Sequence, residues 1–312
     1  MNFIKKNFKD KFILKDNILK IGKLSKIGKK VVSVYNKNPF PNFKDFESKI
    51  DLIHSVEKNV FLKDLKKLIG YKKSFIEVGS GTCQLSLSMA IGTNNEIISL
   101  DPTINSLTLG RDFAKKHNIK NISFLNASLF DAPIQEEYFD FVFCSGVLHH
   151  TENPQKGFNI ISKWLKDEGI IIIGLYNKFG RIRTHFRQFI YRIFGSGNFS
   201  KIIIKYLDPH LRKITKKEQI EAWITDQYEH PVESAHTLDE VLRWFQKEKI
   251  IYLGSIPDCD LDGVYIGLNN MNGNKGSFIN RLFSQIGMIF TKSGSEGGLF
   301  IVIGKKIKNN IQ

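Results

Sequence analysis

The 312-residue sequence lacks long hydrophobic runs and contains only three cysteines. A membrane-spanning helix needs roughly 18 or more apolar residues in succession, and the longest candidate, GIIIIGL at 169–175, is far shorter. Lysines interrupt the first fifteen residues too often for a signal peptide, so we expect a cytoplasmic chain. Cys83, Cys144 and Cys259 show neither CxxC nor Cys/His ligand spacing, which predicts reduced, packed thiols and no metal site.

Acidic residues are scarce beside basic ones, with 31 Asp and Glu against 46 Lys and Arg, a net charge of +15. Such a balance is typical of proteins that bind nucleic acid or anionic surfaces. Lys, Ile and Asn are common throughout, as A+T-biased coding would produce, and no RNA-binding module is visible, so we do not expect nucleic acid. Four of the eight arginines crowd into GRIRTHFRQFIYRIFG, where guanidinium groups suit carboxylates or phosphates: Arg181, Arg183, Arg187 and Arg192.

From Ser74 onward, short apolar strands alternate with helical stretches. This pattern predicts an α/β fold, a doubly wound Rossmann-like sheet with right-handed crossovers. We expect strands near 74–79, 96–100, 121–125, 139–145, 169–175, 250–256 and 299–304, and helices near 83–91, 103–118 and 154–166.

The segments outside this alternation divide the chain into four parts. Apolar residues among many lysines in 1–35 predict one or two basic amphipathic helices, and the prolines of YNKNPFPNF (35–43) indicate a boundary. Thr237 and Glu240 form the pattern of a capping box for a helix to about 248. The predicted parts are a helical cover at 1–70, a core at 71–178, a helical insertion or lid at 179–236, and the C-terminal part of the core at 237–312.

The stretch FIEVGSGTCQLS (75–86) places glycines directly after the first predicted strand of the sheet. Without Cβ atoms, Gly79 and Gly81 let a ligand approach the backbone at the sheet edge where doubly wound folds bind ligands. Asp101 ends the next strand, 24 residues after Glu77, about where an acid can accept hydrogen bonds from ribose hydroxyls. Alternatively, Asp101 is only the N-cap of a helix that Pro102 opens.

Taken together, these stretches resemble the motifs of class I S-adenosylmethionine-dependent methyltransferases. FIEVGSGTCQLS resembles their first motif, with Cys83 in place of a third glycine, and ISLDPTINSL resembles the second. NASLFDAP resembles the loop that holds adenine, but Ser128 stands where Asp or Asn is common. YFDFVFCSGVLHHTENPQKGF and LKDEGIIIIGLYN resemble the fourth and fifth strands, and NPFPN, GLYNKFGR and DQYEHPVES look like a bacterial subgroup whose acceptor they do not identify.

The resemblance implies a seven-stranded sheet with an antiparallel last strand and S-adenosylmethionine as the cofactor. It also implies which positions contact this cofactor. They are Glu77, Gly79, Ser80, Gly81, Asp101, Pro102, Ser128, Leu129, Ser145 and Gly146.

Methyl transfer to a hydroxyl needs a proton acceptor, and histidine is the side chain that serves this purpose near neutral pH. His150, together with His149, follows the fourth predicted strand and is our first choice for that base. Tyr176 and Asn177 follow the fifth strand and could line the acceptor pocket. His230, in the proline-containing stretch WITDQYEHPVES, is a second candidate base on a lid. The alternative is that all of these residues only form polar turns.

The arginine-rich stretch has apolar residues at helical spacing, which predicts a helix resting on the core with Arg183 and Arg187 in water. It could instead bind an anionic acceptor or a membrane surface. The apolar positions are Ile182, Phe186, Phe189, Ile190 and Ile193.

The sequence therefore predicts a methyltransferase that acts on a small-molecule or lipid-like acceptor, with an anionic acceptor and peripheral membrane contact through basic helices left open. Three alternatives remain: an RNA methyltransferase, a partner protein that binds the cofactor without catalysis, and an NAD-dependent oxidoreductase. An NAD-dependent oxidoreductase typically has the motif GxGxxG, whereas Gln84 occupies the position of the third glycine when Gly79 is counted as the first. The sequence does not indicate the oligomeric state.

Overall fold

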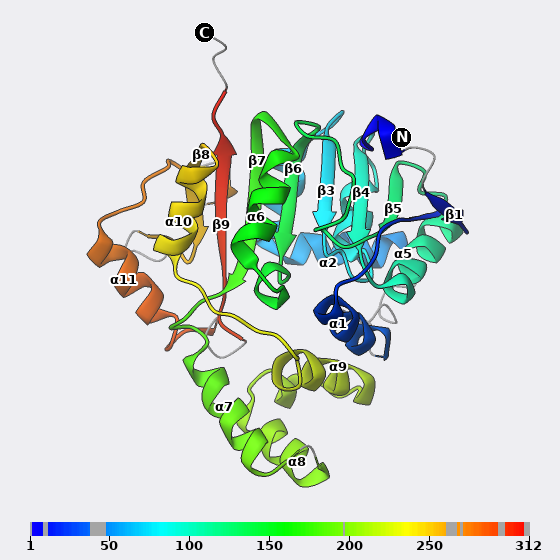
Figure 1. Cartoon of the computed structure of the whole chain (residues 1–312). Coiled ribbons are helices and arrows are strands. Elements are labelled where there is room, and N and C mark those ends of the chain that lie inside the picture. Colours follow the sequence, from blue (N-terminus) through cyan, green and yellow to red (C-terminus); the bar gives the residue numbers. More distant parts are fainter. Residues whose placement is uncertain are drawn as a thin grey trace.

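The computed structural model describes residues 2–8, 12–37, 48–195, 197–259, 267–268, 271–292 and 297–308. Within them the chain forms a mixed sheet with helices on both faces (Figure 1), which confirms the predicted α/β fold. The strands are β1 (Ile13–Lys15), β2 (Ile18–Lys20), β3 (Ser74–Val78), β4 (Glu96–Asp101), β5 (Ile122–Asn126), β6 (Phe139–Ser145), β7 (Leu165–Tyr176), β8 (Ile250–Ile256) and β9 (Leu299–Lys306).

Helices connect most of these strands. Among the residues described, no helix is both long enough and apolar enough to cross a bilayer. The α-helices are α1 (Lys26–Lys37), α2 (Lys49–Lys58), α3 (Val60–Ile69), α4 (Gln84–Ala90), α5 (Ile104–Lys116), α6 (Pro154–Lys163), α7 (Ile182–Ile193), α8 (Asn198–Leu207), α9 (Lys217–Tyr228), α10 (Leu238–Lys247) and α11 (Phe278–Gly287).

The sheet has the strand order β1-β2-β5-β4-β3-β6-β7-β9-β8. β3 lies at its centre and pairs in parallel with β4 and β6, so the carboxyl ends of these strands meet at one edge. β9 is antiparallel to β7 and β8, as expected for the last strand. The expected seven strands are present, but β1 and β2 extend the sheet to nine.

The N-terminal segment differs from the prediction of amphipathic helices. β1 and β2 form an antiparallel hairpin, and β2 adds to the sheet in parallel with β5. Asp16 and Asn17 make the turn with φ of 49° and 61°, a backbone conformation that Asp and Asn tolerate better than most residues. The signal missed in the sequence is therefore a two-residue turn between two short ILK strands. In this segment only α1 is the α-helix that was expected. Of the predicted boundary at 35–43, residues 38–43 lie outside those described.

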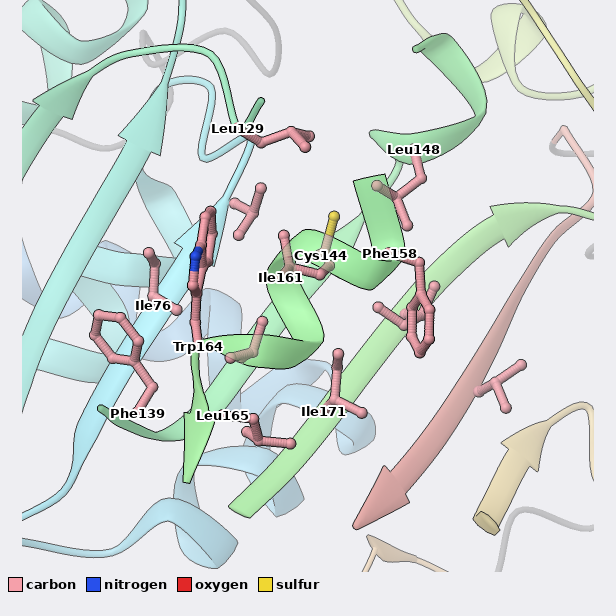
Figure 2. Close-up of a cluster of buried hydrophobic side chains, with 14 of the residues drawn as sticks. Ile76, Leu129, Phe139, Cys144, Leu148, Phe158, Ile161, Trp164, Leu165 and Ile171 are labelled. Carbon is pink, nitrogen blue, oxygen red and sulfur yellow. The ribbon is translucent and has the colours of Figure 1, made fainter. Parts of the chain in front are cut away.

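Side chains of the central strands alternate between two apolar layers, because successive residues of a strand face opposite sides of the sheet. Phe75 belongs to the layer that contains residues of α3 and α4, and Ile76 belongs to the layer that contains residues of α6 and α10. Figure 2 shows part of the second layer, where Phe158 and Ile161 of α6 lie among residues of the sheet. This two-sided packing fixes the sheet edge on which the site is built.

The insertion after β7 is helical, as predicted, and comprises α7, α8 and α9. It has a small apolar core of its own, which includes Tyr191, Ile204, Leu211 and Ile224. The predicted orientation of α7 is wrong, because Thr184 and Arg187 are buried while most of the apolar stripe is exposed: Ile182, Phe186, Phe189 and Ile193.

α10 begins as predicted, but its cap is only half of a capping box. The Thr237 side chain accepts a hydrogen bond from the Glu240 amide. The Glu240 carboxylate does not accept a hydrogen bond from the Thr237 amide, as a full capping box requires, and instead lies 2.9 Å from Nδ1 of His236.

Candidate active site

The turn between β3 and α4 has the geometry that its glycines indicate. Gly79 and Gly81 adopt φ of 71° and 50°, and the amides of Gly79 and Ser80 donate to the Leu100 carbonyl at 2.7 and 3.1 Å. A Cβ built on Gly79 would come within 2.2 Å of Cγ2 of Val147. Both the positive φ and the crowding therefore require glycine at position 79.

Cys83 preserves this turn although it replaces a glycine. Its φ of 64° lies in the left-handed region that glycine adopts most readily. Space for the side chain comes from Gly110 on α5, where an added Cβ would lie 2.7 Å from both Cβ and Sγ of Cys83. Burial raises the pKa of the Cys83 thiol, so the group is a neutral packing residue. Cys144 and Cys259 are also buried and unpaired, as predicted.

Glu77 lies beneath the turn and binds the start of α4. Its Oε2 accepts hydrogen bonds from the amide of Ser86 at 2.9 Å and from the hydroxyl of the same residue. Burial raises the pKa of Glu77 to about 8, although both hydrogen bonds from Ser86 oppose the shift. Glu77 therefore links the strand, the helix and the cavity described below.

Asp101 bridges the ends of β3 and β4. Its Oδ2 accepts from the Gly81 amide at 2.8 Å, and its Oδ1 accepts from the Thr103 amide at 2.7 Å. Thr103 is the N-cap of α5, so the alternative interpretation of Asp101 as N-cap and Pro102 as first helical residue is wrong. Burial raises the pKa of Asp101 to about 6, against the backbone hydrogen bonds that lower it. Each carboxylate oxygen keeps a lone pair for a ligand.

A cavity of about 410 Å³ opens at this edge of the sheet, a volume within the range of small-molecule sites. All ten positions predicted to contact the cofactor line it, together with His150 and Tyr176. Those ten are Glu77, Gly79, Ser80, Gly81, Asp101, Pro102, Ser128, Leu129, Ser145 and Gly146.

The candidate catalytic side chains come from three separate parts of the chain and meet beside this cavity. The ring of His149 stacks on that of Tyr176 with centroids 3.8 Å apart, and the rings of His149 and His150 are 4.3 Å apart. The ring of His230 lies 3.7 Å from that of His150. The structure therefore brings all four residues into one cluster.

His150 has the arrangement of a neutral base. Its Nδ1 lies 2.9 Å from the Val232 carbonyl oxygen, which only accepts hydrogen bonds. Nδ1 therefore carries the proton, and Nε2 keeps its lone pair. Burial lowers the pKa of His150, and the nearby Asp226 carboxylate only partly opposes this shift. The imidazole is thus neutral and able to accept a proton at neutral pH.

His149 and His230 support this cluster from outside the main cavity, since neither is among the residues that line it. His149 is fully buried, and its Nδ1 accepts from the Tyr176 amide at 3.3 Å. Burial lowers the pKa of both residues, that of His230 to about 4. His230 lines a second, polar pocket of about 400 Å³ between α7 and the loop that follows α9. The structure therefore favours His150 as the base.

Three polar residues complete the cavity wall without having been among the predicted site residues. The Tyr35 hydroxyl on α1 donates to Oδ1 of Asp226 at 2.7 Å. Gln227 donates to Oδ2 of the same carboxylate at 2.7 Å and to the Tyr176 hydroxyl at 2.8 Å. Burial, followed by the Asp226 charge, raises the pKa of Tyr35, which stays protonated. Tyr35 precedes a proline-rich stretch, but nothing in its surrounding sequence marks a site.

Arg181 is a buried anchor of this wall. Its guanidinium pairs with the Glu233 carboxylate through Nε at 2.9 Å and through a second nitrogen, and it lies 3.7 Å above the Tyr176 ring. Burial alone would raise the pKa of Glu233, but hydrogen bonds from His185 and Arg181 lower it to about 2. Arg181 therefore fixes Tyr176 and is not free to bind an anionic acceptor.

Asn177 does not line the cavity, contrary to expectation. It is fully buried, donates to Oε1 of Gln285 at 2.9 Å, and accepts from the amides of Phe179 and Gly180. These contacts give it a structural role at the start of the insertion.

The residues present fit S-adenosylmethionine. Glycines at the turn leave the backbone accessible, and Asp101 keeps acceptor capacity beside it. Among the described residues that line the cavity there is no Lys or Arg, whereas four carboxyl groups are present: Glu77, Asp101, Glu152 and Asp226. Such a lining suits the positive charge of a sulfonium.

Comparisons with known proteins find methyltransferases over the same part of the chain. Residues 69–192 match the family model of a methyltransferase domain. An uncharacterized protein of Synechococcus sp. is 25% identical over 199 residues, which cover 57% of this chain and 47% of that protein. The demethylmenaquinone methyltransferase of Staphylococcus haemolyticus is 25% identical over 138 residues, covering 42% of this chain and 57% of that enzyme. The matched region thus spans about half the length of these curated relatives.

The fold also matches solved structures. PKMT2 from Rickettsia typhi in complex with AdoHcy aligns with a TM-score of 0.56 at 14% identity, over 81% of this chain and 53% of that one. At this identity the likeness concerns the fold alone. The family model, the fold and the fit of the cavity together identify residues 69–192 as a class I S-adenosylmethionine-dependent methyltransferase domain.

Proposed function

We propose that this protein transfers a methyl group from S-adenosylmethionine to a small, largely apolar, lipid-like acceptor. One observation carries the proposal. A neutral His150 with a free Nε2 lines the same cavity as the glycine turn and Asp101. A binding site for the cofactor and a group that can accept a proton therefore share one cavity.

The cofactor half of the site is provided by the ends of β3, β4 and β6 and the loop after β5. Asp101 would accept hydrogen bonds from the ribose hydroxyls, and Gly79 and Gly81 would let the ligand contact the backbone. Ser128 and Leu129 would lie against the adenine ring of the cofactor. When bound, S-adenosylmethionine supplies a methyl group on a positively charged sulfur that leaves as a neutral thioether.

The chain itself positions the acceptor and takes up its proton. His150 would accept that proton at Nε2, while the Val232 carbonyl holds its Nδ1 proton and keeps the ring orientation. Tyr176, held between the His149 ring and the Arg181 guanidinium, would limit the space in front of this base. General-base catalysis of this kind contributes about 10²–10⁴-fold to a rate.

The lining of the cavity supports an apolar acceptor rather than an anionic one. The Asp101 carboxylate is ionised above its pKa of about 6 and would repel an anion, and no Lys or Arg is among the described lining residues to attract one. Apolar side chains of α1 and of the loops form much of the remaining wall: Leu24, Ile27, Val31, Phe130 and Val147. The names of the demethylmenaquinone methyltransferase relatives, which act on a quinone, are consistent with this class. A peripheral contact with a membrane would bring such an acceptor within reach.

The test uses cofactor labelled in its methyl group and a cell extract separated into lipid, small-molecule, RNA and protein pools. We expect label in the lipid or small-molecule pool, and much less with His150→Ala at saturating cofactor. Label in RNA would support the RNA methyltransferase alternative. Cofactor binding without transfer to any pool would support a non-catalytic partner protein, and binding of NAD instead would support an oxidoreductase.

A further inference from the structure

The outer side of α7 is apolar and faces solvent. Phe186 and Phe189 are 64% and 61% exposed, and Ile182 and Ile193 continue the same stripe at intervals of three or four residues. The inner side carries Thr184, Arg187 and Tyr191, all of which are buried. An amphipathic helix normally buries its apolar stripe, whereas this stripe is left uncovered by the residues that the structure describes.

α8 continues the apolar surface. Phe199, Ile202 and Tyr206 are spaced by three and four residues and are 63%, 67% and 79% exposed, whereas Ile204 points into the small core of the insertion. The stripes of the two helices adjoin where the rings of Phe194 and Phe199 meet edge to face, 5.6 Å apart. The apolar ridge is therefore formed by Ile182, Phe186, Phe189, Ile193, Phe194, Phe199, Ile202 and Tyr206.

The chain segment that carries this apolar ridge is strongly basic. Asp208 is the only acidic residue between 182 and 217, and it is buried, where it accepts from the Trp223 indole at 2.9 Å and the Tyr228 hydroxyl at 2.6 Å. The exposed cations of this segment are Arg183, Arg192, Lys205, Arg212, Lys213, Lys216 and Lys217. A second copy of the chain would bring the same positive charge, so self-association through this surface is disfavoured.

We propose that the apolar ridge docks this protein on an anionic lipid bilayer. Phenylalanine and isoleucine side chains would enter the boundary between headgroups and acyl chains, and the flanking Lys and Arg would contact anionic headgroups. An apolar surface on a chain segment rich in exposed cations matches both parts of such an interface. Nucleic acid would attract the cations, but it would leave the aliphatic part of the ridge in water.

The position of the ridge relates docking to the cavity. α7 and α8 lie beyond α9 at the same end of the molecule as the carboxyl ends of the parallel strands (Figure 1). α9 carries Asp226 and Gln227 of the cavity wall, and Tyr191 of α7 donates to Glu229 directly after it. Docking would therefore hold the cavity near the lipid surface. The lipid-like acceptor rests on the proposed function, whereas the docking itself does not.

The experiment measures co-sedimentation of the full-length protein with vesicles of phosphatidylcholine alone or mixed with phosphatidylglycerol. We expect binding to the mixed vesicles, which decreases with salt, and little binding to phosphatidylcholine. The double variant F186E/F189E should bind at least about tenfold more weakly, because it places charge where apolar contact is required. Both side chains are exposed, so the thermal midpoint and cofactor affinity should stay unchanged.

The matched control is I50E/V60E, which adds the same charges at exposed apolar positions of α2 and α3, each 61% exposed. Its vesicle binding should stay within about twofold of the wild type, since only the net charge changes. An equal loss in both double variants would show a general charge effect and overturn the ridge as the docking surface. Binding of the wild-type protein to RNA but not to vesicles would also overturn the ridge as a lipid-docking surface. Methyl transfer to an acceptor dispersed in detergent is measured separately, so docking can fail while the proposed function stands.

Discussion

The two halves of the cavity are built differently. The cofactor half comes from turns at consecutive strand ends, in which neighbouring residues in the sequence remain neighbours in space, as in Gly79, Ser80 and Gly81. The acceptor half joins α1, the loop after β6, the end of β7 and α9, which lie far apart in the chain. The cofactor half can therefore be predicted from local sequence motifs, whereas the acceptor half depends on how the insertion folds over the sheet.

This difference predicts two classes of mutant effect. Substitutions in the cofactor half should change cofactor affinity, whereas substitutions in the acceptor half should change turnover at saturating cofactor. A substitution that changed both cofactor affinity and turnover at saturating cofactor would show that the two halves of the cavity do not act separately.

His150→Ala should give the largest effect, a decrease in kcat of about 10²–10⁴-fold with cofactor affinity unchanged, because only the proton acceptor is removed. Burial lowers the pKa of His150, so the base form persists as the pH falls through about 6.5, the ordinary histidine value. The wild-type rate should therefore hold at pH 6.5 and decrease only at lower pH.

The control for this variant is His54→Ala, at an exposed position of α2 away from the cavity, which should leave kcat unchanged. Normal turnover in His150→Ala would remove His150 from the mechanism.

Gly79→Ala should weaken cofactor binding about 10- to 100-fold. The new Cβ must displace Val147, and the residue must keep a strained φ of +71°, at a cost of order 1–3 kcal/mol. Gly92→Ala is the matched control, since it has φ of +72° and no atom within 4 Å of the new Cβ. Calorimetric titration and thermal unfolding of both variants separate crowding at the site from backbone strain. Equal cofactor affinity in the two variants would contradict the assignment.

Asp101→Ala should weaken cofactor binding about tenfold or more, as the loss of a charged hydrogen-bond acceptor typically does. The pKa of Asp101 is raised to about 6, so wild-type affinity should decrease as the pH falls through this value and the carboxylate is protonated. That pH dependence should disappear in the variant. Asp112→Ala, at an exposed acid of α5, should bind cofactor normally.

Tyr35→Phe should give the smallest effect. It removes one hydrogen bond to Asp226, which keeps its bond from Gln227, so a loss of about 0.5–1.5 kcal/mol is expected. We expect this loss as a few-fold increase in the KM of the acceptor in steady-state assays, with cofactor affinity unchanged. A change in cofactor affinity alone would place Tyr35 in the other half of the site.

The N-terminal segment and α7 differ from what their sequences predict. Apolar residues among lysines fit a helical period, yet the Asp16-Asn17 turn folds this part of the N-terminal segment into the hairpin of β1 and β2. The apolar period correctly predicts that α7 is a helix, but the apolar side of this helix faces solvent instead of the core. Periodicity shows that a helix has an apolar side and cannot show whether that side meets the core, because this depends on residues distant in the sequence, such as Tyr228 and Glu229, which contact Tyr191 of α7.

The sequence by itself determined the alternating α/β order, the positions of β3 to β9 and the residues from Glu77 to Gly146 that line the cavity, because these follow from local periodicity and from turns next to strand ends. Only the tertiary structure decided which histidine faces the cavity, that Tyr35, Asp226 and Gln227 share its wall, and that Arg181 is buried against Glu233. The hydrogen bonds from Tyr35 to Asp226, from Arg181 to Glu233 and from Gln227 to Tyr176 join residues 191, 52 and 51 positions apart. Their geometry arises from the packing of the insertion and α1 over the sheet edge, which no local pattern encodes.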